Sequence, residues 1–299
     1  HQIVTPLVAG QRQPETGQSW ILVTALPKQE PGSAGATEPA AGDVDETAVS
    51  PSSETPGATH MPETPPIVLT VVYDNRTQDP LLRAAWGFAC LIETPAATIL
   101  FDTGGDGAIL MHNMATLGID PGLIDIVVLS HHHSDHTGGL PAVLESNDHL
   151  VVYVPASFAS GITASVQERA QVVAVTEPLE IVPGVWTLGE MGSSVREQSL
   201  ALEESRGLAV VTGCAHPGIV AIVERARDYG PVDLVLGGFH LGDRTAAQIE
   251  AVVEALQGLG VQRVGPGHCT GELAIEMFHA AFGAEFVSVH VGTRVMLEP

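Results

Sequence analysis

Four histidines and one aspartate fall within six residues of the segment LSHHHSDHTGGL. In an extended segment alternate side chains point the same way, so His131 and His133 can reach one cation. After a tight turn, Asp135 and His136 can face a second cation beside the first, and His132 is predicted to point elsewhere. Two adjacent divalent cations polarise a carbonyl or phosphoryl oxygen and hold a hydroxide at neutral pH, which hydrolysis requires.

The alternative is a histidine-rich surface loop that binds metal adventitiously and has no catalytic role. The apolar run IDIVVLS precedes the tract, and Thr137, Gly138 and Gly139 follow it. A buried strand before the histidines and a tight turn into a helix near Leu140 are typical of a metal site whose geometry the fold determines. The pattern therefore favours a site that does chemistry.

Further polar side chains follow apolar, strand-like runs elsewhere in the chain. Asp102 follows TILF, Cys214 and His216 follow AVVTG, His240 follows LVLGGF, and His268 follows VGPG. Strand ends of a shared sheet system converge in space, so residues far apart in sequence can build one site there. If Cys214 is a thiolate ligand, it favours zinc. The alternative is that Cys214 binds no metal and packs as a small buried residue at the end of the strand.

Strand and helix patterns alternate from residue 67 onward. Strands are predicted at 67–73, 87–93, 97–102, 125–130, 150–154, 170–175, 184–188, 208–213, 232–238 and 261–267. Helices are predicted at 107–117, 219–228, 245–259 and 271–281. Hairpin-like turns early and alternating helices later predict an α+β fold, a four-layer αββα sandwich formed by residues 67–299.

Residues 1–66 differ in character from the rest. Residues 30–66 are rich in Pro, Ala, Ser, Thr, Gly and acidic side chains, and they contain no Lys or Arg. Such a segment buries too little apolar surface to offset its ordering entropy, which predicts a disordered acidic linker. The apolar run Ser19–Pro27 is interpreted as an extra strand rather than the remnant of an export or tethering segment.

Charge and composition restrict the classes of partner that this chain can bind. The chain has 12 Lys and Arg against 35 Asp and Glu, a formal net charge of −23, which disfavours nucleic acid. No apolar run reaches the roughly 18–20 residues of a membrane span. The partner expected is a small-molecule substrate. Three cysteines do not make a disulfide framework, which favours a reduced, cytoplasmic compartment over export after loss of a signal segment; the oligomeric state stays open.

The motif SHHHSDHTGGL, with FDTGGDG about thirty residues upstream, resembles the signature of the metallo-β-lactamase superfamily, whose fold is an αββα sandwich. Together with VVYDN, AWGFACLIE, TGCAHPGI, GGFHLG and GPGHCTG, it resembles a subfamily similar to a dihydropterin-linked synthase of methanopterin biosynthesis. The resemblance covers residue 67 to the C-terminus and nothing before it.

The resemblance implies a role for each residue of the first half of the site. Asp102 would orient the histidine loop, His131 and His133 would bind the first metal, and Asp135 and His136 would bind the second. It implies two divalent metal ions, with zinc favoured and iron or manganese as alternatives.

This chain departs from the superfamily pattern at the third histidine. The expected region reads VWTLGEMGSS and has Glu190 where histidine is usual, so either Glu190 or His216 takes that place. The bridging position falls on Cys214 or His216, and the last ligand on His268. Cys269 is expected to point away from the metals.

The function expected is a dinuclear metal-dependent hydrolase whose metal-bound hydroxide attacks an ester, lactone, amide or phosphoester of a small molecule. Asp135 would take the hydroxide's proton. His240 would be a ligand, a proton donor to the leaving group or a structural residue, and Asn75 would hydrogen-bond substrate. For Trp86 and Phe88, core packing is favoured over lining the substrate mouth. The alternatives are a pterin-linked transferase that uses the same metals, and a non-catalytic metal-binding or sensor protein.

Overall fold

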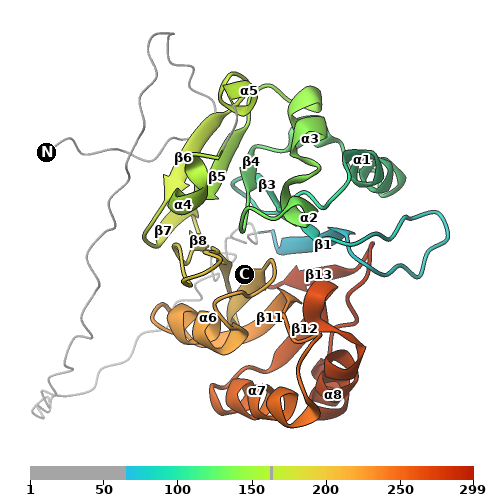
Figure 1. The fold of residues 1–299 in the computed structure, drawn as a ribbon, viewed down its shortest axis with the longest axis vertical. Coiled ribbons are helices and arrows are strands. Elements are labelled where there is room, and N and C mark those ends of the chain that lie inside the picture. Colours follow the sequence, from blue (N-terminus) through green and yellow to red (C-terminus); the bar gives the residue numbers. More distant parts are fainter. Residues whose placement is uncertain (1–64, 162–163) are drawn as a thin grey trace, which may run out of the picture. The chain divides into compact units, whose positions relative to one another are not determined.

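Two mixed β-sheets packed face to face form the centre of the computed structural model, which describes residues 65–161 and 164–299 (Figure 1). The predicted strand at Ser19–Pro27 lies outside the described residues, and so does the predicted linker of residues 30–66 apart from its last two residues. Residues 65–299 fall in one compact unit of the chain. No helix in the described part is both long and apolar enough to cross a membrane.

The first sheet has seven strands in the order β13-β1-β2-β3-β4-β5-β6. Neighbours from β13 to β3 are antiparallel, whereas β3, β4, β5 and β6 are parallel. Their bounds are β1 Ile67–Tyr73, β2 Ala89–Glu93, β3 Thr98–Phe101, β4 Ile126–Val128, β5 Val151–Pro155, β6 Gln171–Val175 and β13 Arg294–Leu297.

The second sheet has six strands in the order β12-β11-β10-β9-β8-β7. Here β10, β11 and β12 are parallel, and the remaining pairs are antiparallel. Their bounds are β7 Leu179–Val182, β8 Val185–Thr187, β9 Leu200–Glu204, β10 Gly207–Thr212, β11 Val232–Gly238 and β12 Arg263–Gly267.

Helices cover the outer face of each sheet (Figure 1). Those beside the first sheet are α1 Gly107–Thr116, α2 Ser134–Thr137, α3 Leu140–Ser146, α4 Ala156–Ala159 and α5 Ala164–Gln167. Those beside the second are α6 Ile219–Ala226, α7 Ala246–Gly258 and α8 Glu272–Phe282. Short 3₁₀ turns lie at Pro121–Leu123, His268–Thr270 and Gly283–Glu285.

Strand β2 is apolar along its length because both of its faces are buried. Cys90 and Ile92 pack between the two sheets, while Ala89 and Leu91 pack against the outer helices. Side chains alternate along a strand, so a strand covered on both faces reads as a continuous apolar run. The four layers confirm the predicted αββα sandwich.

Three strands were missed by the sequence patterns: β7, β9 and β13. Strand β13 alternates buried and exposed residues over only four positions, and β9 ends on two glutamates. Both gain their strand geometry from pairing with a neighbour, β13 with β1 and β9 with β8 and β10. Local β propensity is weak compared with such tertiary pairing.

Candidate metal centre

The predicted site residues lie at the carboxyl ends of strands from both sheets. Asp102 follows β3, the histidine tract follows β4 and enters α2, and the TGCAH turn follows β10. His240 comes after β11 and His268 directly after β12. The imidazole rings meet across the two sheets, with centroids of His131 and His216 4.7 Å apart and of His136 and His268 4.9 Å apart.

Sharp backbone turns occur at four of the strand ends that form the site. Asp102, Ala215, His240 and His268 have φ of 58°, 58°, 54° and 46°, and they are the non-glycine residues with positive φ in the described chain. The left-handed region costs free energy for residues with a Cβ, and such strain is retained where function requires it. All four residues lie in the strand-end turns that form the site.

Close backbone contact joins the FDTGGDG loop to the histidine tract. A Cβ added at Gly139 would overlap the backbone oxygen of Thr103, and one at Gly138 would overlap that of Gly105. Thr103 also donates from its backbone N–H to the carbonyl of His136 at 2.8 Å. The two glycines after the tract are therefore needed to seat it on the neighbouring loop.

Five groups of side chains in the described residues have donor atoms within 4.8 Å of one another, as a metal site requires. The groups are His131, His136 and Cys214; His131, His133 and His216; Cys214, His216 and His240; Cys214, His268 and Cys269; and Asp135, His136 and His268. They share members, so they form one connected cluster.

Hydrogen bonds determine which ring nitrogen of His131 faces this cluster. The Ser130 hydroxyl donates to Asp102 Oδ2 at 2.7 Å, so it is left to accept from His131 Nδ1–H at 2.9 Å. A neutral imidazole protonated at Nδ1 carries its lone pair on Nε2. Nε2 of His131 lies 3.0 Å from Nδ1 of His133, inside the cluster.

The same logic applies to His136 and His268. His136 Nδ1 donates to the buried carboxylate of Asp102 at 2.7 Å. Asn75 Oδ1 accepts from Gly87 N–H, which fixes the amide orientation, and it also accepts from His268 Nδ1 at 3.2 Å. The two Nε2 atoms then face each other at 3.2 Å, and His136 Nε2 is also 3.2 Å from Cys214 Sγ.

Two lone pairs pointing at each other repel unless a cation lies among them, so this donor set fits metal ions. A buried orphan atom supports the fit: His216 Nε2 has no hydrogen-bond partner in the structure. Burial lowers the pKa of His216 to about 4, so its ring is neutral and able to act as a ligand. Burial opposes a charge on His136, but Asp102 and Asp135 raise its pKa, and their field equally favours a metal cation.

The structure separates the two alternatives for the missing third histidine. His216 lies with His131 and His133 in one donor group. Glu190 does not join any of these groups: its carboxylate accepts from the backbone N–H of Ser157 at 3.0 Å and pairs with Arg196 at 3.3 Å. Of the two, His216 therefore lies beside His131 and His133, and Glu190 does not.

The prediction that Cys269 points away from the metal cluster is wrong. Its Sγ lies in one donor group with Cys214 and His268, and the thiol donates to the carbonyl oxygen of Cys214 at 3.6 Å from the 3₁₀ turn at His268–Thr270. A hydrogen bond from the Cys214 thiol holds the pKa of Cys269 below its ordinary value, and one with Cys269 raises the pKa of His240. His240 is exposed and lies at the edge of the cluster, its ring centroid 4.5 Å from that of His216.

His132 is exposed and outside all five donor groups; its ring lies 4.8 Å from His133 and 6.2 Å from Phe158, centroid to centroid.

The core-packing expectation is wrong for Trp86, which is 63% exposed, and right for Phe88, which is fully buried. Trp86 has its ring 5.0 Å from that of His268, so this aromatic side chain borders the cluster and faces solvent.

Sequence reasoning missed two buried carboxylates that support the site. Glu197 accepts from the backbone N–H groups of Cys214, Ala215 and His216 at 2.9, 3.0 and 2.8 Å. Asp74 accepts from the backbone N–H of His268 at 2.9 Å, and burial raises its pKa to about 6. Asp74 directly precedes Asn75, which was a usable signal; nothing around Glu197 in sequence indicated its role.

Comparison with known proteins agrees with this geometry. The family profile described as the metallo-beta-lactamase superfamily matches residues 87–228. A protein of Methanocaldococcus jannaschii named 7,8-dihydropterin-6-methyl-4-(beta-D-ribofuranosyl)-aminobenzene-5'-phosphate synthase is 31% identical over 258 residues, which cover 69% of this chain and 88% of that protein. This chain belongs to the metallo-beta-lactamase superfamily. The resemblance predicted from the motifs is confirmed.

Solved structures give the same fold. A metal-dependent hydrolase of the beta-lactamase superfamily is 27% identical with a TM-score of 0.66, covering 78% of this chain and 100% of that one. A diphosphatase from the PhnP family, at 15% identity and a TM-score of 0.54, covers 78% of this chain and 100% of that one and shows the shared fold alone.

Proposed function

We propose that this chain is a metal-dependent hydrolase that holds two divalent metal ions and cleaves an ester, lactone, amide or phosphoester of a small molecule. The observation that carries the proposal is the convergence of the Nε2 atoms of His131, His136 and His268 beside Cys214, with the second nitrogen of each ring already hydrogen-bonded.

The donor groups suggest how the ligands are shared. His131, His133 and His216 would hold one metal ion, and Asp135, His136 and His268 the other. Cys214 belongs to groups on both sides and would lie between them. Imidazole and thiolate donors together favour zinc over magnesium or calcium, with iron or manganese as alternatives.

Bound metal ions would polarise the substrate and lower the pKa of water, and the chain's own side chains supply the rest. Asp102, Ser130 and Asn75 hold the ligand rings in one tautomer and orientation. Asp135 Oδ2 lies 3.6 Å from His136 Nε2 and 3.3 Å from His268 Nε2, where it accepts a proton from the attacking water. His240, exposed at the rim, donates a proton to the leaving group.

Metal analysis and a substrate panel test this proposal together. Protein purified without added metal is expected to contain close to two equivalents of metal, and one or none contradicts the two-metal site. A panel of chromogenic phosphodiester, lactone, ester and β-lactam substrates is then tested with wild type and His133→Ala. Hydrolysis of at least one substrate is expected, with a loss of at least a hundredfold in His133→Ala.

The matched control is His149→Ala. His149 is a surface histidine whose side chain is 90% exposed and pairs with the adjacent Asp148. Hydrolysis that survives in His133→Ala, or that falls equally in His149→Ala, would show that the assigned site is wrong.

The name of the 31% identical relative favours a second candidate, a transferase that joins a dihydropterin to an aryl amine. The same metal cluster would activate the pterin's leaving group while water is kept out. The discriminating assay supplies a dihydropterin with an activated 6-methyl group and an aryl amine. A coupled product in excess of the hydrolysed pterin supports the transferase, and hydrolysed pterin alone supports the hydrolase.

A further inference from the structure

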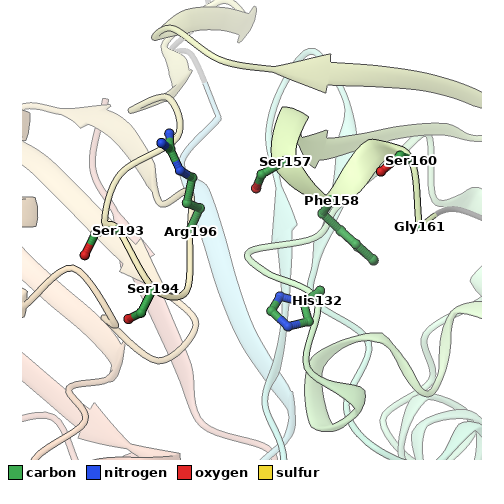
Figure 2. Close-up of a pocket in the computed structure, with 8 residues that line it drawn as sticks. All are labelled: His132, Ser157, Phe158, Ser160, Gly161, Ser193, Ser194 and Arg196. Carbon is green, nitrogen blue, oxygen red and sulfur yellow. The ribbon is translucent and has the colours of Figure 1, made fainter.

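A cavity of about 480 Å³ is lined by His132, the residue between the candidate ligands His131 and His133. Figure 2 shows two facing walls: Ser193, Ser194 and Arg196 on one, and Ser157, Phe158, Ser160, Gly161 and His132 on the other. The first wall belongs to the segment between β8 and β9, and the second to α4 and the histidine tract. The cavity therefore spans both halves of the sandwich, as the metal cluster does.

The cavity is connected to the cluster through His132. This residue stands between the candidate ligands His131 and His133, and its ring centroid is 4.8 Å from that of His133. On its other side the ring faces Phe158 at 6.2 Å. A molecule in the cavity would thus contact two aromatic rings and lie next to the metal-binding histidines.

The lining of the cavity carries a cationic side chain, although the chain as a whole is strongly acidic. The formal net charge is −23, yet the residues that line the cavity include Arg196 and no aspartate or glutamate. Arg196 is 51% exposed, whereas its partner Glu190 is only 3% exposed. Glu190 Oε2 accepts from the Ser157 N–H at 3.0 Å, and Glu190 Oε1 lies 3.3 Å from Arg196 Nη1. A guanidinium has more N–H donors than this one contact uses, so donors of Arg196 remain for a ligand.

The hydroxyls of the cavity are also available. The side chains of Ser157, Ser160, Ser193 and Ser194 are exposed and make no hydrogen bond to other residues in the described part of the chain. A guanidinium and several free hydroxyl donors are the groups that bind phosphate and carboxylate oxygens. Glu190, where the chain departs from the superfamily pattern, forms an ion pair with Arg196 at this cavity.

We infer that this cavity is the substrate's anion subsite: it binds a phosphate or carboxylate group through Arg196 and the serine hydroxyls, beside an aromatic ring that packs on Phe158 and His132. The inference rests on the proposed function, since it makes the substrate of the metal centre an anionic, ring-bearing small molecule.

Binding is tested with phenyl phosphate and benzoate, and with benzyl alcohol as the neutral counterpart, titrated into the metal-loaded full chain by calorimetry. Arg196→Gln is expected to weaken the anions about tenfold, the factor that loss of a charge-assisted hydrogen bond predicts. Benzyl alcohol should change by less than a factor of two. Arg196→Lys should retain part of the anion binding, which also shows that a loss in Arg196→Gln is not a folding defect.

Two further variants separate the subsite from a structural role. Arg206→Gln is the control for loss of an arginine. Arg206 has a similar exposure (48%) and directly precedes β10, at the end of that strand away from the metal cluster, so anion binding should stay at the wild-type value. Glu190→Gln keeps an acceptor for Ser157 and removes the competing charge, so it should tighten the anions. A merely structural Glu190–Arg196 pair predicts no tightening.

Equal anion binding by wild type and Arg196→Gln would mean that the metal ions alone hold the anion, and it would overturn the inference. Because these titrations need no turnover, they are read independently of the substrate panel. Weakened binding in Arg196→Gln with no hydrolysis of any substrate supports the subsite and contradicts the hydrolase.

Discussion

Replacing Glu197 by glutamine tests whether a buried carboxylate holds the Cys214–His216 turn in its ligating position. Glu197 is 1% exposed. Its Oε1 accepts from the N–H groups of Cys214 and Ala215, and its Oε2 accepts from the N–H of His216 at 2.8 Å. Glutamine keeps one oxygen but places an NH₂ group opposite one of these donors.

The expected cost follows from that single mismatch. With the amide oxygen at the Oε1 position, the N–H of His216 loses its acceptor and faces another donor, which costs about 1–3 kcal/mol for a buried group. Burial already raises the pKa of Glu197, so removal of the charge recovers part of this cost. A net loss of roughly 2 kcal/mol corresponds to a fall of about 1 M in the urea midpoint at a slope of ~2 kcal/mol/M.

The assay is urea unfolding at pH 7, followed by metal analysis of the folded variant. A displaced His216 should reduce bound metal from two equivalents toward one. Glu203→Gln is the control, because Glu203 is exposed on β9 and its carboxylate accepts from Trp186 Nε1 at 3.3 Å. The unfolding free energy of this variant should change by less than about 0.5 kcal/mol. A Glu197→Gln protein with wild-type midpoint and full metal content would refute the reasoning.

Three further perturbations have defined outcomes. Asp102→Asn should weaken metal binding about 10–100-fold in a chelator competition. With its amide oxygen held by the Ser130 N–H, asparagine places an NH₂ group opposite His136 Nδ1–H; unchanged affinity would contradict the orienting role. Gly139→Ala should lower the unfolding free energy by about 1–3 kcal/mol through overlap with Thr103, while Gly258→Ala, with open space around it, should be neutral or stabilising. In mass-spectrometric alkylation, Cys269, which is half-buried and whose pKa is held below its ordinary value by the hydrogen bond from Cys214, should react faster once a chelator is added. Cys90, whose pKa burial raises to about 12, should stay unreacted until the chain unfolds.

The first half of the site was predictable because its geometry is local. The spacing of His131, His133, Asp135 and His136 on a strand end and one turn of helix determines which side chains share a direction. The same holds for most strands, since a run buried on both faces is apolar throughout. Short edge strands such as β13 lack that signal, because half of their side chains face solvent.

The second half of the site depends on contacts between the two sheets. Nothing near His216 in sequence shows that its ring reaches His131, since that contact requires the end of β10 to face the end of β4. The inward position of Cys269 depends on the turn after β12, and the support from Glu197 on a segment seventeen residues before Cys214.

By itself, the sequence indicated the superfamily through the resemblance of its motifs. It also determined the αββα fold and the type of donor on each strand end, because these follow from side-chain alternation and local spacing. Only the tertiary structure decided that His216 rather than Glu190 joins His131 and His133, that Trp86 faces solvent beside His268, and that Arg196 lines a cavity next to the cluster. Ligand sets are completed through space, where the packing of two sheets sets the distances, and no spacing along the chain encodes those distances directly.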